Sequence, residues 1–179
     1  MKTKFSLPLY FKDCLYDSAR QTANLGVDII KVDEILFFEM IRLSVDAPYP
    51  YSMRASRIIQ LCCELYPHML LPYIEEIVLI IINTTVGGVR RNYLKIFSEH
   101  IDIYKLQDIG LIVAKCFEWL SSVSEPIAVR CYCMDILYKV SMKETDIQNE
   151  LDTLLELHLK YGSSAFRNKA LKILGIKNH

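Results

Sequence analysis

Histidine, cysteine and carboxylate side chains could hold a metal ion or transfer protons, but their spacing here argues against both kinds of chemistry. No histidine stands in a pattern such as H-E-x-x-H, and no C-x-x-C occurs. On one helix, Glu156 and His158 would point about 200° apart, so they could not share a metal ion. We expect histidines on the surface or at helix ends, and no metal or cofactor. The four histidines are His68, His100, His158 and His179.

Two pairs of carboxylates, Asp33-Glu34 and Glu75-Glu76, are adjacent in sequence. Adjacent residues on a helix diverge by about 100°, so neither pair could flank a substrate as paired catalytic carboxylates do. Both pairs fall in the first turn of predicted helices, where the helix dipole favours negative charge. We interpret them as structural.

The pair Gly87-Gly88 precedes a predicted helix that carries Arg90 and Arg91. Such a helix N-terminus could bind an anion through its main-chain N–H groups. The alternative is a tight turn between two helices that needs a positive φ, which glycine adopts without strain. We favour the turn.

Residues 162–169 read Gly-Ser-Ser-Ala-Phe-Arg-Asn-Lys and are similar to the signature loop of the fumarase and adenylosuccinate lyase superfamily. That loop runs Gly-Ser-Ser-x-Met-Pro-x-Lys-x-Asn, and the resemblance implies a catalytic serine base at Ser163 or Ser164. Those enzymes are more than twice as long as this chain. We instead expect one of the two serines to be the N-cap of a helix. The matching residues are Gly162, Ser163, Ser164 and Lys169.

The strongest pattern in the chain is a helix-opening segment that recurs around arginines at positions 54, 90, 130 and 167, with spacings of 36, 40 and 37 residues. An apolar residue precedes each arginine, and apolar residues follow it at the fourth and seventh positions. These offsets lie on one face of an α-helix, so each segment is predicted to bury one stripe. The central residues are Arg54, Arg90, Arg130 and Arg167.

A second apolar helix is predicted before each of these segments, at residues 32–44, 71–83, 108–121 and 147–161. Three of the four are apolar nearly all round, which indicates helices packed between neighbours. A period near 37 residues without glycine-rich turns is typical of stacked helix pairs. The sequence therefore predicts an all-α protein of about four helix pairs.

Two runs, Asp46-Ala47-Pro48 with Met53-Arg54-Ala55 and Glu125-Pro126 with Val129-Arg130, resemble the second helix of a HEAT repeat. That pattern reads acidic residue, proline, Val-Arg and then an apolar face. The resemblance implies a HEAT-like (armadillo-type) α-α superhelix, a solenoid. We place the array at residues 29–179 and an N-terminal capping helix within residues 1–28, in a single domain overall.

The capping helix is predicted over residues 9–24, where Phe11, Leu15 and Ala19 stand four residues apart. The first repeat of a solenoid lacks a neighbour on one side and needs such a cover. The four repeat arginines are expected to be structural and to reach a carboxylate or carbonyl of a neighbouring repeat. Candidate carboxylates are Asp46, Glu125 and Asp146.

In HEAT-like arrays the second helices line the concave side, which implies a stripe of polar groups with modest positive charge there. Such a groove suits a protein or peptide partner; the alternative is a solvated face without a partner. We expect a non-enzymatic scaffold. The expected stripe is Arg91, Asn92, Lys95, Tyr132, Asp135, Asn168, Lys169 and Lys172.

A second function comes from a resemblance in architecture to the HEAT-like alkylpurine DNA glycosylases, which use an aspartate, aromatic residues and a basic groove. Asp135 is the acidic residue that we would place in the groove. The formal net charge of zero argues against a nucleic-acid partner.

Cysteine content and hydropathy indicate a cytoplasmic protein with no membrane partner. No secretory signal is evident, and the longest apolar run, residues 77–82, is far below the roughly 20 residues that span a bilayer. The six cysteines are expected to be small buried apolar residues and not disulfides.

Overall fold

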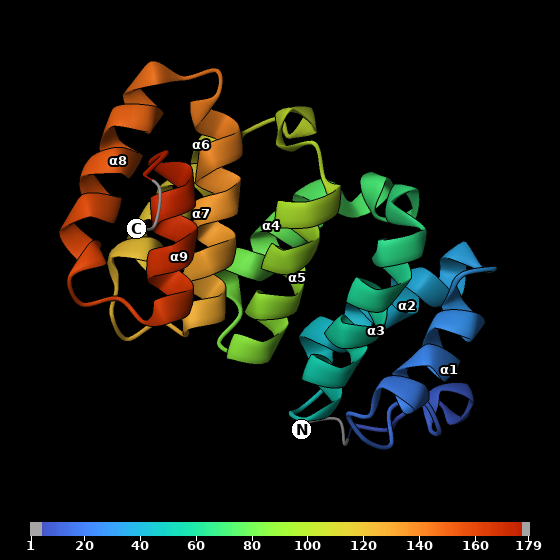
Figure 1. Cartoon of the computed structure of the whole chain (residues 1–179). Helices are drawn as coiled ribbons and strands as arrows, with labels where there is room; N and C mark the ends of the chain where they lie inside the picture. Colours follow the sequence, from blue (N-terminus) through green and yellow to red (C-terminus); the bar gives the residue numbers. More distant parts are fainter. Residues whose placement is uncertain (1–4, 177–179) are drawn as a thin grey trace. The chain divides into compact units, whose positions relative to one another are not determined.

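The computed structural model describes residues 5–176, and over this range it is helical and contains no β-strand (Figure 1). The predicted all-α helical repeat fold is confirmed. The α-helices are α1 (Arg20–Ile30), α2 (Glu34–Asp46), α3 (Tyr51–Leu65), α4 (Ile74–Asn83), α5 (Gly87–His100), α6 (Ile109–Ser121), α7 (Ile127–Ser141), α8 (Thr145–Leu159) and α9 (Ser164–Ile173). Three short 3-10 helices join them: η1 (Leu9–Phe11), η2 (Pro67–Tyr73) and η3 (Ile103–Lys105).

The helices alternate in the predicted order of first and second members of a pair. The first helices are α2, α4, α6 and α8. Each begins and ends within three residues of the first and last residues that the sequence predicts. The second helices are α3, α5, α7 and α9, and each repeat arginine is the fourth residue of its helix. The repeat in the sequence is therefore a repeat of helix pairs in phase with the arginines.

The residues four and seven positions after each arginine face the core, as their spacing predicts. Ile58, Leu94 and Met134 are completely buried, as are Phe97 and Leu137. In α9 the equivalent residues Leu171 and Leu174 are half-buried. The apolar stripe of the second helices is thus fully covered in α3, α5 and α7 and partly covered in α9.

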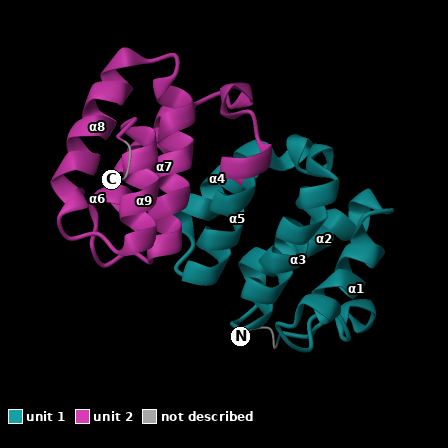
Figure 2. Cartoon of the chain, viewed as in Figure 1, with its two compact units in different colours: residues 1–96 teal, residues 97–179 magenta. Residues whose placement is uncertain are grey.

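The chain forms two compact units, Met1–Ile96 and Phe97–His179 (Figure 2). In the first unit, α1 and α2 both pack on α3, and Phe37 and Ile58 are fully buried. In the second unit, α6, α8 and α9 all pack on α7, and Leu155 and Phe166 are fully buried. The second helices α3 and α7 therefore form the centre of their units.

The prediction of one helix over residues 9–24 is wrong. The chain forms η1, then a turn, and α1 begins only at Arg20. Asp17 Oδ1 accepts a hydrogen bond from the Ala19 N–H at 2.8 Å, which offers the main chain an alternative to the helix. Phe11 and Leu15 are buried, so their four-residue spacing reflects a compact turn and not a continuous helix.

The expected helix over residues 71–83 begins later, at Ile74, because η2 occupies residues 67–73 and contains Pro72. Proline lacks the N–H that would continue an α-helical ladder. The carboxylates that follow, Glu75 and Glu76, lie in the first turn of α4, as predicted. Asp33 likewise caps α2, where its carboxylate accepts the N–H groups of Ile35 and Leu36.

The prediction of a positive-φ turn at Gly87-Gly88 is also wrong. Both glycines lie inside the first turn of α5, and in the described residues only Gly175 has a positive φ. Gly88 has a different reason to be glycine: a Cβ there would stand 2.5 Å from Met53 Cγ. The N-terminus of α5 therefore approaches α3 more closely than a larger residue would allow.

Candidate partner-binding surface

The repeat arginines of the first unit donate hydrogen bonds to main-chain carbonyls. Arg54 Nη1 lies 2.9 Å from the carbonyl oxygen of Leu15 and 2.7 Å from that of Tyr16. Arg90 Nη2 lies 2.9 Å from the carbonyl oxygen of Thr84, in the loop between α4 and α5. Both side chains thus tie the start of a second helix to the segment beside it.

Arg130 is the most buried of the four, with 4% of its surface exposed. Its Nε donates to the Leu120 carbonyl at 3.0 Å, and its Nη2 donates to His158 Nδ1 at 3.2 Å. The guanidinium carbon lies 4.3 Å from the centre of the Phe166 ring, within range of a cation–π contact. Arg130 therefore joins α6, α8 and α9 around α7.

This buried contact changes the proton affinity of both partners. Partial burial lowers the pKa of His158, and the positive charge of Arg130 lowers it further. Burial also lowers the pKa of Arg130 from its very high ordinary value. The lowered pKa of His158 favours a neutral imidazole, whose Nδ1 accepts a hydrogen bond from the Arg130 guanidinium.

Arg167 differs from its repeat equivalents, because its side chain is exposed and has no hydrogen bond to the described residues. Of the candidate carboxylates within the described residues, Asp46 and Asp146 form no bond with a repeat arginine. Asp46 accepts hydrogen bonds from Arg42 in its own helix, at 3.2 and 2.9 Å. Asp146 lies exposed in the first turn of α8, and the Glu125 N–H donates to the Ser122 carbonyl in the preceding turn.

In the first unit, the expected binding residues on α5 fall into three different environments. Arg91 is exposed. Asn92 is buried, with 4% of its surface exposed, and its Nδ2 donates to Ser56 Oγ at 2.9 Å. Asn92 is therefore not part of an accessible surface, because the position two residues after the arginine faces α3.

Lys95 bridges α5 to α3 through an ion pair with Glu64, at 2.9 Å. Gln60 and Arg20 also donate to the Glu64 carboxylate. Partial burial raises the pKa of Glu64, but the hydrogen bonds from Lys95 and Gln60 and the nearby positive charges lower it below its usual value overall. Lys95 is thus partly occupied by a neighbouring second helix.

In the second unit, α9 is tied to α7 by Lys169, which forms an ion pair with Asp135 and also donates to the Cys131 carbonyl at 3.3 Å. The aspartate suggested by the glycosylase resemblance is therefore held in a contact between helices. Tyr132 is half-buried on α7. Asn168 and Lys172, one helical turn apart on α9, are exposed.

The loop that resembles the lyase signature opens α9. Ser163 is the N-cap, and its hydroxyl oxygen accepts a hydrogen bond from the Phe166 N–H at 3.3 Å. The prediction of a serine N-cap at this loop is confirmed. A Cβ at Gly162 would stand 2.7 Å from Phe166 Cδ1, so the ring packs directly over the loop.

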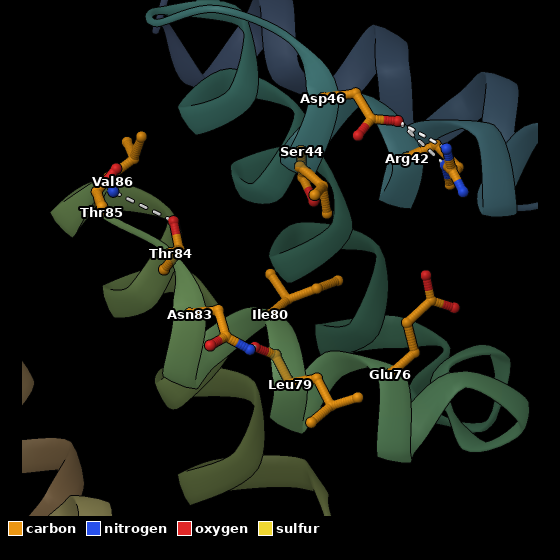
Figure 3. A pocket seen from close by; sticks show the side chains of 11 residues that line it. Arg42, Ser44, Asp46, Glu76, Leu79, Ile80, Asn83, Thr84, Thr85 and Val86 are labelled. Carbon is orange, nitrogen blue, oxygen red and sulfur yellow. Dashed lines mark hydrogen bonds and ion pairs between the residues drawn. The ribbon is translucent and has the colours of Figure 1, made fainter.

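A pocket that sequence reasoning missed lies between two first helices of the first unit, with a volume of about 430 Å³ (Figure 3). It is lined by the last turn of α2, by one side of α4 from Glu76 to Asn83, and by the loop after α4. The sequence carries no signal for it, because an α4 that is apolar nearly all round does not reveal that Leu79 is 53% exposed. Its lining includes Arg42, Val45, Asp46, Glu76, Leu79, Ile80 and Asn83.

Two further observations concern the described part of the chain. No group of three or more histidine, cysteine or acidic side chains within residues 5–176 is arranged to hold a metal ion. Over the same range, no helix combines the length and the apolar character needed to cross a lipid bilayer. The cysteines of this range are free, and five of them are buried.

Comparison with known proteins identifies one family. The family model described as the HEAT repeat domain matches residues 18–175. No curated protein and no solved structure matches the chain. The match agrees with the helix pairs and with the arginine at the fourth position of each second helix. The chain therefore belongs to the HEAT repeat family.

Proposed function

We propose that this HEAT repeat protein is a non-enzymatic scaffold that binds a protein or peptide partner through its second helices. Helical repeats offer extended surfaces, and HEAT repeats commonly take part in protein interactions. We use the name second-helix face for the exposed polar residues of the second helices, which are Arg91 in the first unit and, separately, Asn168 and Lys172 in the second unit.

The proposal depends on one observation: some polar side chains of the second helices are bonded to neighbouring helices, while others are exposed to solvent. Asn92, Lys95 and Lys169 are engaged with neighbouring helices. Arg91, Asn168 and Lys172 remain exposed, and two of these three side chains are cationic. A partner segment that offers carboxylates would complement them, because charge complementarity guides partner choice and association.

The test uses the full-length chain, tagged, to recover partners from an extract of its native cells. A recovered partner is then purified, and its affinity is measured by calorimetry for the unaltered chain and for Arg91→Glu with Lys172→Glu. We expect the charge reversal to weaken binding at least tenfold, since each reversed charge turns an attraction into a repulsion.

The matched control is Lys12→Glu with Lys160→Glu, which changes the net charge equally at exposed lysines outside the second helices. This variant should bind the partner as the unaltered chain does. Equal affinity for the Arg91/Lys172 variant and the control would show that the second-helix face is not the binding surface. Retention of the thermal unfolding midpoint checks that both variants are folded.

A further inference from the structure

The pocket between α2 and α4, which we call the first-helix pocket, combines apolar walls with negative charge (Figure 3). Val45 and Leu79 contribute apolar side chains that are about half exposed. Asp46 and Glu76 contribute carboxylates. The cavity volume, about 430 Å³, falls in the range of pockets that accept a small ligand or a long side chain.

The charges around the pocket do not cancel. Asp46 is paired with Arg42 of the same helix, at 2.9 Å. Glu76 is half-buried and forms no hydrogen bond or ion pair with the described residues. In Figure 3 the Glu76 side chain stands on the α4 side of the pocket, opposite the Arg42–Asp46 pair. Glu76 therefore has no cationic side chain as a partner, and its compensation within the described residues is the dipole of α4, in whose first turn it lies.

The main chain adds to this negative charge. The last turn of α2 and the last turn of α4 both line the pocket. The C-terminal end of a helix carries a partial charge of roughly −0.5, which favours a cation nearby. The two helix ends thus favour a cation at one end of the pocket, and Glu76, about two turns away at the start of α4, favours a cation at the other.

A pocket of the same design recurs between the first helices of the second unit. It has a volume of about 380 Å³ and is lined by α6 and α8, including Glu150, Leu154 and Leu157. Glu150 and Leu154 are four residues apart on α8, as Glu76 and Ile80 are on α4. Each pocket thus combines a glutamate with an aliphatic side chain one helical turn further along a first helix, although the two glutamates stand at different distances from their repeat arginines.

We propose that the first-helix pocket receives a lysine or arginine side chain of a partner protein. The aliphatic stem lies against Val45 and Leu79, and the cationic head lies beside Glu76. Long basic side chains have this division into an apolar stem and a charged head. The proposal concerns the first helices and does not depend on whether the second-helix face binds a partner.

The experiment follows the amide and methyl resonances of the isotope-labelled full chain by two-dimensional NMR during titration with capped tripeptides. The probes are acetyl-Gly-Lys-Gly-amide, the same peptide with norleucine, and the same peptide with glutamate. We expect saturable shifts at residues 42–46 and 76–86 with the lysine peptide. The norleucine peptide, which keeps the stem and loses the charge, should bind about tenfold more weakly, because a charge-assisted contact is lost.

The variant Glu76→Gln keeps the shape of the side chain and removes its charge. We expect it to weaken binding of the lysine peptide about tenfold, while Glu156→Gln, at an exposed glutamate of α8, leaves the affinity unchanged. Unchanged resonances elsewhere show that the variant is folded. Equal affinity for the lysine and norleucine peptides, preference for the glutamate peptide, or no effect of Glu76→Gln would each overturn the proposal.

Discussion

At the scale of single residues, the repeat arginine lies in four different environments. The repeat arginine bonds to a preceding turn in α3, to its own inter-helix loop in α5, and to two other helices in α7. In α9 it is exposed. The four repeat arginines therefore contribute different amounts to the free energy of unfolding, because each helix has different neighbours.

Arg130→Ala should lower the free energy of unfolding by about 2 to 3 kcal/mol. The substitution leaves the Leu120 carbonyl without its buried donor and removes the contact with the Phe166 ring. The measurement is urea unfolding followed by circular dichroism.

The matched control is Arg167→Ala, the same substitution at the same repeat position on an exposed side chain. We expect a change within about 0.5 kcal/mol there, as for most surface substitutions. A similar loss at both sites would mean that the buried contacts of Arg130 contribute little.

At the scale of elements, second helices are joined to one another by polar contacts as well as by apolar packing. Asn92 bonds to Ser56, both two residues after a repeat arginine, and Lys169 at the same position pairs with Asp135. This row of positions faces the neighbouring second helix. The predicted binding stripe therefore mixes residues that hold the array together with residues that face solvent.

The two adjacent glycines of α5 should respond in opposite ways to alanine. Gly88→Ala should destabilise the protein by roughly 1 kcal/mol, because the new Cβ would stand 2.5 Å from Met53 Cγ and force that side chain to move. Gly87→Ala meets no atom within 4 Å and should be neutral or stabilise by roughly 0.5 kcal/mol, since alanine favours helix.

Thermal and urea unfolding of the two variants side by side test this difference. The comparison is internally controlled, because both substitutions add one methyl group to the first turn of the same helix. Equal stability of the two variants would contradict the close approach of α5 to α3 at Gly88.

At the scale of the whole molecule, the chain is built from two units, each with its own central second helix. In repeat proteins, stability is close to a sum of contributions from each repeat and from its interfaces with its neighbours. Damage to one unit should therefore be felt mainly within that unit.

Leu155→Ala tests this expectation at a fully buried position of α8. The cavity should cost about 3 kcal/mol. Hydrogen exchange measured by mass spectrometry should accelerate in α6 to α9 more than in α1 to α3, with Phe37→Ala in α2 giving the reverse pattern. Equal acceleration throughout in both variants would indicate a single cooperative unit.

The sequence alone determined the all-α class, the helix pairs and the core face of each second helix. These follow from periodicity, which a chain must display to bury one stripe of a helix, and the arginines marked the fourth residue of each second helix. Periodicity did not predict two helix starts, because local side-chain chemistry set them. Asp17 accepts a main-chain hydrogen bond in the turn before α1, and Pro72 keeps α4 from beginning earlier.

Only the tertiary structure decided which polar residues are accessible and where pockets lie. Asn92 and Lys172 look alike in sequence as polar residues on a wet face, yet one is buried against α3 and the other faces solvent. The pocket beside Glu76 exists because residues of α2, of α4 and of the loop after α4 surround one hollow. Contacts between helices distant in sequence set such features, and periodicity within one helix carries no information about them.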